Sequence, residues 1–232
     1  MGFRLILFDL DDTLFDHIGA VESALAETSQ TYPELATRPL SEVVAENLRV
    51  IEEIHPRVLA GNIDVDAARR ERMLRLFKFC GSTCTPEQAE RVAMHYWAAY
   101  RRNRRTTAGA REVLEFLRGR ATVGIVSNNL AAEQAEKLKL LRLSSLVDFV
   151  LTSEDAGVTK PQPEIYLRAL VIGGASAAET VFVGDAWEAD VVGPMNVGIA
   201  AVWLSRGRVA PAAPQPFAVI RTLPELPAVL EA

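Results

Sequence analysis

The chain has 232 residues, of which 49% are hydrophobic and 24% are charged. These ordinary values exclude wholesale disorder and allow one large domain, or one domain with a smaller companion. The formal net charge of −5 argues against a general nucleic-acid-binding surface, and two cysteines, Cys80 and Cys84, are too few for a disulfide scaffold.

The chain begins with a short apolar run, residues 3–8, which ends at Asp9. A run that is apolar throughout is typical of a strand buried on both faces of a parallel sheet. The run is too short for a signal peptide, and no stretch approaches the roughly 18 consecutive apolar residues of a transmembrane helix. We therefore expect a cytoplasmic protein with no membrane partner.

Residues 16–105 contain helical patterns and no convincing strand. Ser41, Asp64 and Thr85 stand where N-caps would open the second, third and fourth helices of this stretch. A helical insert of this length can form a small domain of its own. The expected helices cover residues 17–31, 42–55, 65–80 and 86–102.

Strands and helices alternate after Gly109. This alternation predicts an α/β fold with a parallel sheet and right-handed crossovers. The expected strands cover residues 122–126, 149–151, 181–183, 199–204 and 218–220, and the expected helices cover residues 109–119, 131–141, 163–172, 188–196 and 223–231.

The helix predicted over 131–141 carries four charged side chains at helical spacing: Glu133, Glu136, Lys137 and Lys139. Charges of opposite sign three or four residues apart are typical of a solvated helix face with internal ion pairs. We therefore expect all four side chains to lie at the surface.

Carboxylates follow two of the predicted strands directly. Asp9 and Asp11 follow the first strand, and Asp185 follows the strand over 181–183, with Asp190 five residues later. Ligands bind outside the carboxyl ends of the strands in an open parallel sheet. Because several carboxylates at one edge cannot all stay ionised without a cation, we expect a hard metal ion there, and Mg²⁺ is the usual choice beside phosphate.

Donor groups are expected at the same edge. Ser127 and Asn128 end the strand over 122–126, and Lys160 lies in a loop just before a helix. A hydroxyl, an amide and one ammonium group beside a metal would form a cradle for a phosphate group.

Four motifs in this order resemble the haloacid dehalogenase-like (HAD) hydrolase superfamily. They are Asp-x-Asp-x-Thr at residues 9–13, GIVSNN ending its strand, KPQPEIY from Lys160, and GDAWEAD from residue 184. The resemblance covers roughly residues 1–16 and 106–205. With the long helical insert, it points to the helical-capped phosphatase subgroup, which includes phosphoglycolate phosphatases and nucleotidases. It implies a Rossmann-like core of residues 1–15 and 106–232, with an all-helical cap domain of residues 16–105 inserted after the first strand.

The resemblance also implies roles for the motif residues. Asp9 would be the nucleophile that attacks phosphorus, and Asp11 would protonate the leaving group and then take a proton from water. Asp9 and Asp185 would hold Mg²⁺ directly, together with the backbone carbonyl of Asp11. Asp190 would support the metal site from behind or position Lys160. The phosphoryl oxygens would be bound by Ser127, Asn128 and Lys160.

The expected function is a Mg²⁺-dependent phosphatase that hydrolyses a small phosphorylated metabolite through an aspartyl-phosphate. A nucleoside monophosphate and a phosphoglycolate-like ester are candidate substrates. A phosphomutase and a haloacid dehalogenase of the same superfamily are the alternatives, although Asp11 and Asp185 argue against the dehalogenase, which needs neither. The physiological substrate and the choice between monomer and homodimer stay open.

Overall fold

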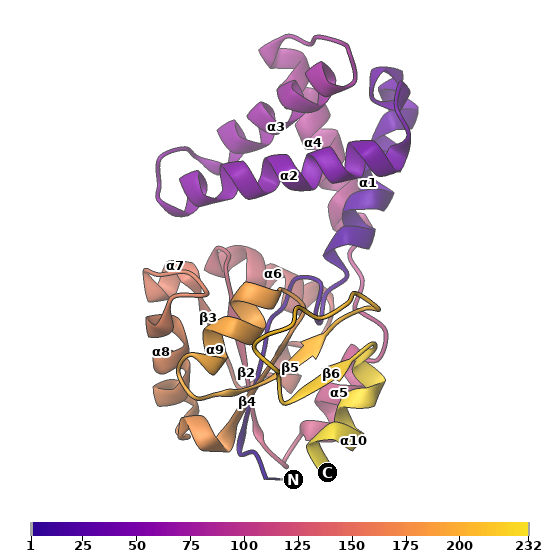
Figure 1. Cartoon of the computed structure of the whole chain (residues 1–232). Helices are drawn as coiled ribbons and strands as arrows, with labels where there is room; N and C mark the ends of the chain where they lie inside the picture. Colours follow the sequence, from indigo (N-terminus) through magenta and orange to yellow (C-terminus); the bar gives the residue numbers. More distant parts are fainter. Residues whose placement is uncertain (1, 232) are drawn as a thin grey trace. The chain divides into compact units, whose positions relative to one another are not determined.

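The computed structural model describes residues 2–231, which fold into two compact units (Figure 1). One unit contains the residues up to Asp16 together with those from Arg105 onward, and the other contains His17–Arg104. The helical unit is therefore an insertion in the chain of the first unit. That it acts as a cap stays a prediction.

The first unit is built on a parallel sheet. Within the described residues the sheet has six strands, in the order β3-β2-β1-β4-β5-β6, and every neighbouring pair is parallel. This confirms the predicted α/β fold class. The strands are β1 (Leu5–Phe8), β2 (Thr122–Ser127), β3 (Phe149–Thr152), β4 (Thr180–Gly184), β5 (Ala200–Leu204) and β6 (Ala218–Ile220).

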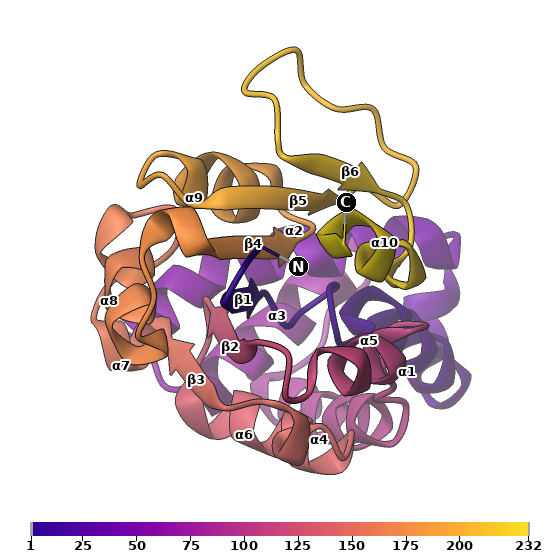
Figure 2. The ribbon, with the colours of Figure 1, turned by 90° about the horizontal axis from the view of Figure 1, so that it is seen from below.

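Helices cover both faces of this sheet (Figure 2). On one face lie α5 (Ala110–Leu117), α6 (Ala131–Leu140) and α10 (Leu226–Glu231); on the other lie α7 (Ser153–Ala156), α8 (Pro163–Gly173) and α9 (Gly193–Met195). Leu7, Tyr166 and Phe182 are fully buried in the core between the sheet and α8. Burial on both faces explains why the strands are continuously apolar.

Shorter elements connect these parts. Where the sequence predicts one helix over 188–196, the chain forms a π-helix followed by the single turn of α9. The short elements of this unit are η2 (Ser144–Leu146), η3 (Ala177–Glu179), the π-helix η4 (Trp187–Val192) and η5 (Leu223–Glu225).

The helical unit contains α1 (His17–Thr31), η1 (Pro33–Ala36), α2 (Leu40–Leu59), α3 (Val65–Phe79) and α4 (Pro86–Arg102). Asp64 and Thr85 cap α3 and α4 as predicted, since each side chain accepts a backbone N–H. The prediction for Ser41 is wrong, because α2 begins at Leu40, two residues before its expected start, and Ser41 lies within its first turn. None of the helices in residues 2–231 is both long and apolar enough to cross a membrane.

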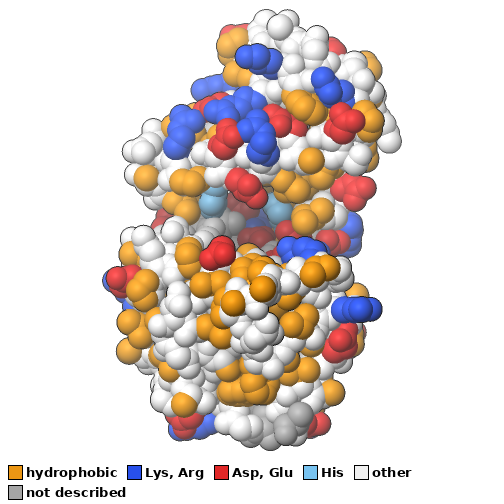
Figure 3. All heavy atoms as spheres, viewed as in Figure 1, with side chains coloured by type: hydrophobic (Ala, Val, Ile, Leu, Met, Phe, Trp, Pro, Cys, Tyr) orange, Lys and Arg blue, Asp and Glu red, His pale blue; other side chains and the backbone are white. Residues whose placement is uncertain are grey.

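Charged side chains of both signs gather on the surface of the helical unit (Figure 3). Arg75 on α3 pairs with Glu53 on α2 at 2.7 Å and with Glu71 on its own helix. Arg57 on α2 pairs with Glu71 at 3.0 Å. These ion pairs link α2 to α3 in solvent, outside the apolar contact between the two helices around Val50.

The strand order places the carboxyl end of β1 at a topological switch point. The chain continues from β1 to β2 on one side, whereas β4 pairs with the other side of β1. Crossovers leave in opposite directions at such a point, so a crevice opens outside the strand ends. The residues that follow β1, β2 and β4 therefore meet at one edge of the sheet.

Candidate active site

Asp9 is fixed by the end of β1 and by the turn that follows it. Its backbone N–H donates to the carbonyl of Val183 on β4, and its side chain is buried. Residues 10–15 form a tight turn in which Asp12 has a φ of +61° and donates its N–H to the Phe15 carbonyl at 2.7 Å. The turn leads the chain away from the sheet while Asp9 stays at the edge.

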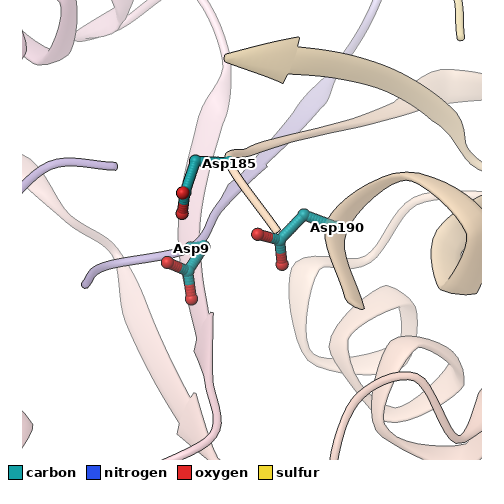
Figure 4. Close-up of side chains that lie close together, drawn as sticks. All are labelled: Asp9, Asp185 and Asp190. Atoms are coloured by element: carbon teal, nitrogen blue, oxygen red, sulfur yellow. The ribbon is translucent and has the colours of Figure 1, made fainter. Parts of the chain in front are cut away.

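Three carboxylates converge at this edge (Figure 4): those of Asp9, Asp185 and Asp190, with oxygen atoms within 4.8 Å of one another. Burial raises the pKa of Asp9 well above its ordinary value, and the charges of Asp190, Asp11 and Asp185 raise it further, against the lowering effect of Lys160. Burial and the charge of Asp190 also raise the pKa of Asp185 to about 7. Burial and like charge in this cluster therefore disfavour the ionised carboxylates.

Arg208 contacts the Asp185 carboxylate of this cluster, with its Nη2 3.1 Å from Oδ2, and Lys160 faces the cluster from inside the protein. The Lys160 Nζ donates to Asp9 Oδ1 and to Asp190 Oδ1, each at 2.7 Å, and the lysine side chain is 2% exposed. Burial opposes the charged form, but the two carboxylates outweigh it and raise the pKa of Lys160 above its ordinary value. A protonated lysine is thus held beside the predicted nucleophile.

The two carboxylate oxygens of Asp190 accept hydrogen bonds from this lysine and from the backbone of the loop before Asp190. Oδ1 accepts from Lys160, and Oδ2 accepts the backbone N–H of Ala186 at 2.9 Å. A Cβ at position 184 would lie 2.4 Å from the Asp190 carboxyl carbon, so Gly184 is required for this close approach. These contacts place Asp190 beside Lys160, and its predicted support of the metal site stays a prediction.

Asn128 holds the backbone of the Lys160 loop. Its side-chain Oδ1 accepts the Lys160 N–H at 2.7 Å, and its Nδ2 donates to the Lys160 carbonyl at 2.9 Å. This pair of hydrogen bonds uses both ends of the side-chain amide. The side chain of Asn128 therefore holds the backbone at Lys160, and its predicted contact with the phosphoryl group stays a prediction.

The carboxylate of Asp11 lies outside the three-carboxylate cluster and meets α6 instead. Its Oδ1 accepts from Lys137 Nζ at 2.6 Å, and its Oδ2 accepts from Gln134 Nε2 at 2.9 Å. The predicted exposure of Lys137 is wrong, because its side chain is 1% exposed, although its predicted ion pair with Glu133 forms at 3.4 Å. Lys137 follows Glu133 by four residues, which is the spacing of ion pairs on exposed helix faces. This spacing alone therefore predicts an exposed side chain.

A signal for this burial was present in the helical period. Gln134, Lys137, Leu138 and Leu141 are spaced three, four and seven residues apart, and all four are buried. That spacing marks one face of a helix. Two polar residues on the buried face of α6 indicate polar partners inside the protein, because burying such groups unpaired is costly.

Ser127 ends β2 beside the same helix. Its hydroxyl is buried, and its Oγ accepts from Gln134 Nε2 at 2.5 Å. Since that contact occupies Oγ as an acceptor, the hydroxyl hydrogen can point elsewhere, as a phosphate-binding donor requires. Gln134 thus connects Ser127 with Asp11.

Comparison with known proteins gives the family. A family model described as a haloacid dehalogenase-like hydrolase matches residues 3–198. Ribulose-1,5-bisphosphate 5-phosphatase of Halopiger xanaduensis is 31% identical over 201 residues, which cover 85% of this chain and 82% of the relative. Glyceraldehyde 3-phosphate phosphatase of Pyrococcus furiosus is 30% identical over 223 residues, which cover 89% and 82%.

A solved structure shows the same fold. The HAD-hydrolase YfnB of Bacillus subtilis, whose crystal structure is bound to magnesium, matches with a TM-score of 0.80 at 24% identity over the full length of both chains. The residues of the candidate site all lie within the range that the family model matches. This chain belongs to the haloacid dehalogenase-like hydrolase family and is a phosphoric monoester hydrolase.

Proposed function

We propose that this enzyme is a Mg²⁺-dependent phosphatase that hydrolyses a small phosphorylated metabolite through an aspartyl-phosphate on Asp9. One observation carries the proposal: the Asp9 carboxylate lies at the carboxyl edge of the sheet, 2.7 Å from the Lys160 ammonium and within an acidic cluster. A carboxylate beside one buried cation is suited to attack phosphorus while the cation binds the phosphoryl oxygens.

The donor set fits a hard divalent cation. It consists of carboxylate oxygens, and burial together with like charge raises the pKa values of Asp9 and Asp185, so a cation would favour their ionised forms. Asp9 and Asp185 would hold Mg²⁺ directly, with the Asp11 backbone carbonyl. Asp190 would support this group through Lys160, whose ammonium donates to Asp190 Oδ1. Bound Mg²⁺ supplies positive charge that offsets the phosphoryl oxygens.

The residues divide the reaction into two steps. In the first, a carboxylate oxygen of Asp9 attacks phosphorus, the bond to the leaving oxygen breaks, and Asp11, which enters this step as the protonated carboxyl group, gives that oxygen its proton. In the second, Asp11 takes a proton from water as the water oxygen attacks phosphorus, and the bond to Asp9 breaks to release phosphate. Lys160 and Ser127 bind the phosphoryl oxygens in both steps, and Asn128 keeps Lys160 in place.

The substrate is proposed by class. The two curated relatives are named for ribulose 1,5-bisphosphate and glyceraldehyde 3-phosphate, both small phosphorylated metabolites. A substrate of this kind agrees with the candidates expected from sequence, a nucleoside monophosphate or a phosphoglycolate-like ester. The expected cytoplasmic location stays a prediction.

The test is a panel of phosphate esters incubated with the purified protein and Mg²⁺, scored by free phosphate. We expect phosphate release from at least one small metabolite and from 4-nitrophenyl phosphate, and no release after exhaustive chelation. Conversion of one phosphate ester to its isomer without free phosphate would indicate the phosphomutase. Chloride release from 2-chloropropionate with no need for metal would indicate the dehalogenase.

A further inference from the structure

The buried face of α6 carries two polar side chains that no step above uses. Gln134 and Lys137 are both buried, and both face the loop that follows β1. Burying a lysine is costly unless its charge is paired, and an aliphatic side chain would fill the same space without that cost. The burial of Lys137 therefore needs a reason in the residues that it contacts.

The contacts of Lys137 centre on Asp11. Its Nζ lies 2.6 Å from Asp11 Oδ1 and 3.4 Å from Glu133 Oε1, and it lies 5.2 Å from the centre of the Phe15 ring in the same loop. The ring belongs to the turn of residues 10–15, so Lys137 packs against the turn and binds the carboxylate that the turn presents.

Gln134 holds the other oxygen of the same carboxylate. Its Nε2 lies 2.9 Å from Asp11 Oδ2 and 2.5 Å from Ser127 Oγ. A carboxylate with separate donors on its two oxygens is fixed both in place and in rotation about its own axis. One amide thereby sets the distance between the acid-base group and a phosphate-binding hydroxyl.

We propose that Lys137 and Gln134 are positioning residues that hold the Asp11 carboxyl group at the angle from which it exchanges a proton with the leaving oxygen. The inference rests on the proposed function, in which Asp11 protonates that oxygen. Neither residue touches the substrate in this account. Both act through Asp11, and Gln134 also acts through Ser127.

Leaving-group dependence separates this role from a structural one. An alkyl phosphate needs a proton on its departing oxygen, whereas 4-nitrophenol departs readily without one, so a misplaced Asp11 harms alkyl esters more. Lys137→Met keeps the length of the side chain and removes its charge. Lys139→Met is the matched control, because Lys139 lies two residues away on the same helix and is exposed.

The experiment measures kcat/KM for 4-nitrophenyl phosphate and for the best alkyl phosphate in the panel. For Lys137→Met we expect a loss on the alkyl ester about tenfold or more greater than the loss on the aryl ester. Lys137→Arg should recover part of that difference, and Lys139→Met should change neither value. An equal loss on both esters, or no loss, would overturn the inference while leaving the phosphatase activity of the wild type intact.

A second variant keeps the test decisive if Lys137→Met does not fold. Gln134→Met removes the nearer of two donors to Asp11 Oδ2, at similar volume, and leaves Asn129 Nδ2 at 3.4 Å; it is judged by the same ratio of losses. A wild-type protein that hydrolyses no ester would contradict the proposed function itself, so the two failures are distinguishable.

Discussion

Lys160 in the α/β unit and Arg75 in the helical unit each lie between two carboxylates, but their surroundings differ. The side chain of Lys160 is 2% exposed, between Asp9 and Asp190, whereas that of Arg75 is 35% exposed, between Glu53 and Glu71. Water screens the second arrangement, and such surface pairs contribute about 0–1 kcal/mol. Burying Lys160 with its two carboxylates costs desolvation free energy, and water does not screen the attraction between their charges.

Within the described residues, the buried charges lie at the candidate active site, and the exposed ion pairs of Arg75 lie in the helical unit instead. Buried lysines occur at the edge of the sheet, where Lys160 contacts Asp9 and Lys137 contacts Asp11. The pairs between α2 and α3 lie on the outside of a helical unit that is held together by apolar side chains such as Val50 and Ile54. Substitutions in the two regions should therefore have very different consequences.

The largest expected effect is that of Asp9→Asn. A neutral amide cannot attack phosphorus, so turnover should fall below detection with every ester in the panel. The substitution also removes one charge from a crowded acidic cluster, so the fold should be retained. Phosphate release and a thermal melt measure the two properties. Normal turnover in this variant would assign the nucleophile to another residue.

Removal of the metal should have the next largest effect. Exhaustive treatment with EDTA should stop hydrolysis, and Mg²⁺ should restore it, because the clustered carboxylates of Asp9 and Asp185 need a cation to stay ionised together. Mg²⁺ should also raise the Tm of the wild type by binding the folded state, and Asp185→Asn should lose most of that rise. Full activity after chelation would contradict the assignment of a metal site.

Lys160→Ala should lower kcat/KM by about 100-fold or more, because it removes a fixed positive charge from the developing phosphoryl charge. It also leaves Asp190 buried without its ion pair, so the melting temperature should fall as well. Steady-state kinetics on 4-nitrophenyl phosphate and a thermal melt provide the two values. A kinetic change below about threefold would mean that Lys160 does not act on the phosphoryl group.

Arg75→Met, in the helical unit, should have the smallest effect of these substitutions. Its two ion pairs are exposed, so the free energy of unfolding should change by less than about 1 kcal/mol. Activity on 4-nitrophenyl phosphate should stay at the wild-type level. Urea unfolding and phosphate release measure both. A loss of activity comparable to that of Lys160→Ala would show that the contrast between the two regions does not hold.

Much of the fold could be predicted because local patterns and global packing agree. The continuous apolar run before Asp9 and the alternation after Gly109 predict the parallel sheet, and the caps at Asp64 and Thr85 locate two helix starts. Ser41 was misleading, because a serine near a helix start can occupy the first turn as well as the cap position. Side-chain type alone does not distinguish the two.

Those site residues that lie at the ends of strands could be predicted from the sequence. Asp9 and Asp185 follow β1 and β4, and Ser127 ends β2. These strands are neighbours in the sheet, so the meeting of the three residues is a consequence of topology. The burial of Lys137 was not predicted, because its charge pattern with Glu133 is the same for an exposed pair and a buried one. Whether Lys137 is exposed or buried depends on the packing of α6 against the loop after β1, which the charge pattern does not reveal.

Direct identification of the phosphorylated residue tests the central claim. Wild-type protein is mixed with 4-nitrophenyl phosphate and Mg²⁺, quenched within a single turnover, and reduced with borohydride, which converts an aspartyl-phosphate to homoserine. Peptide mapping by mass spectrometry should then find homoserine in place of Asp9 and no change at Asp11, Asp185 or Asp190. Reduction at another aspartate, or steady hydrolysis with no reduced residue, would contradict the assignment of Asp9 as the nucleophile.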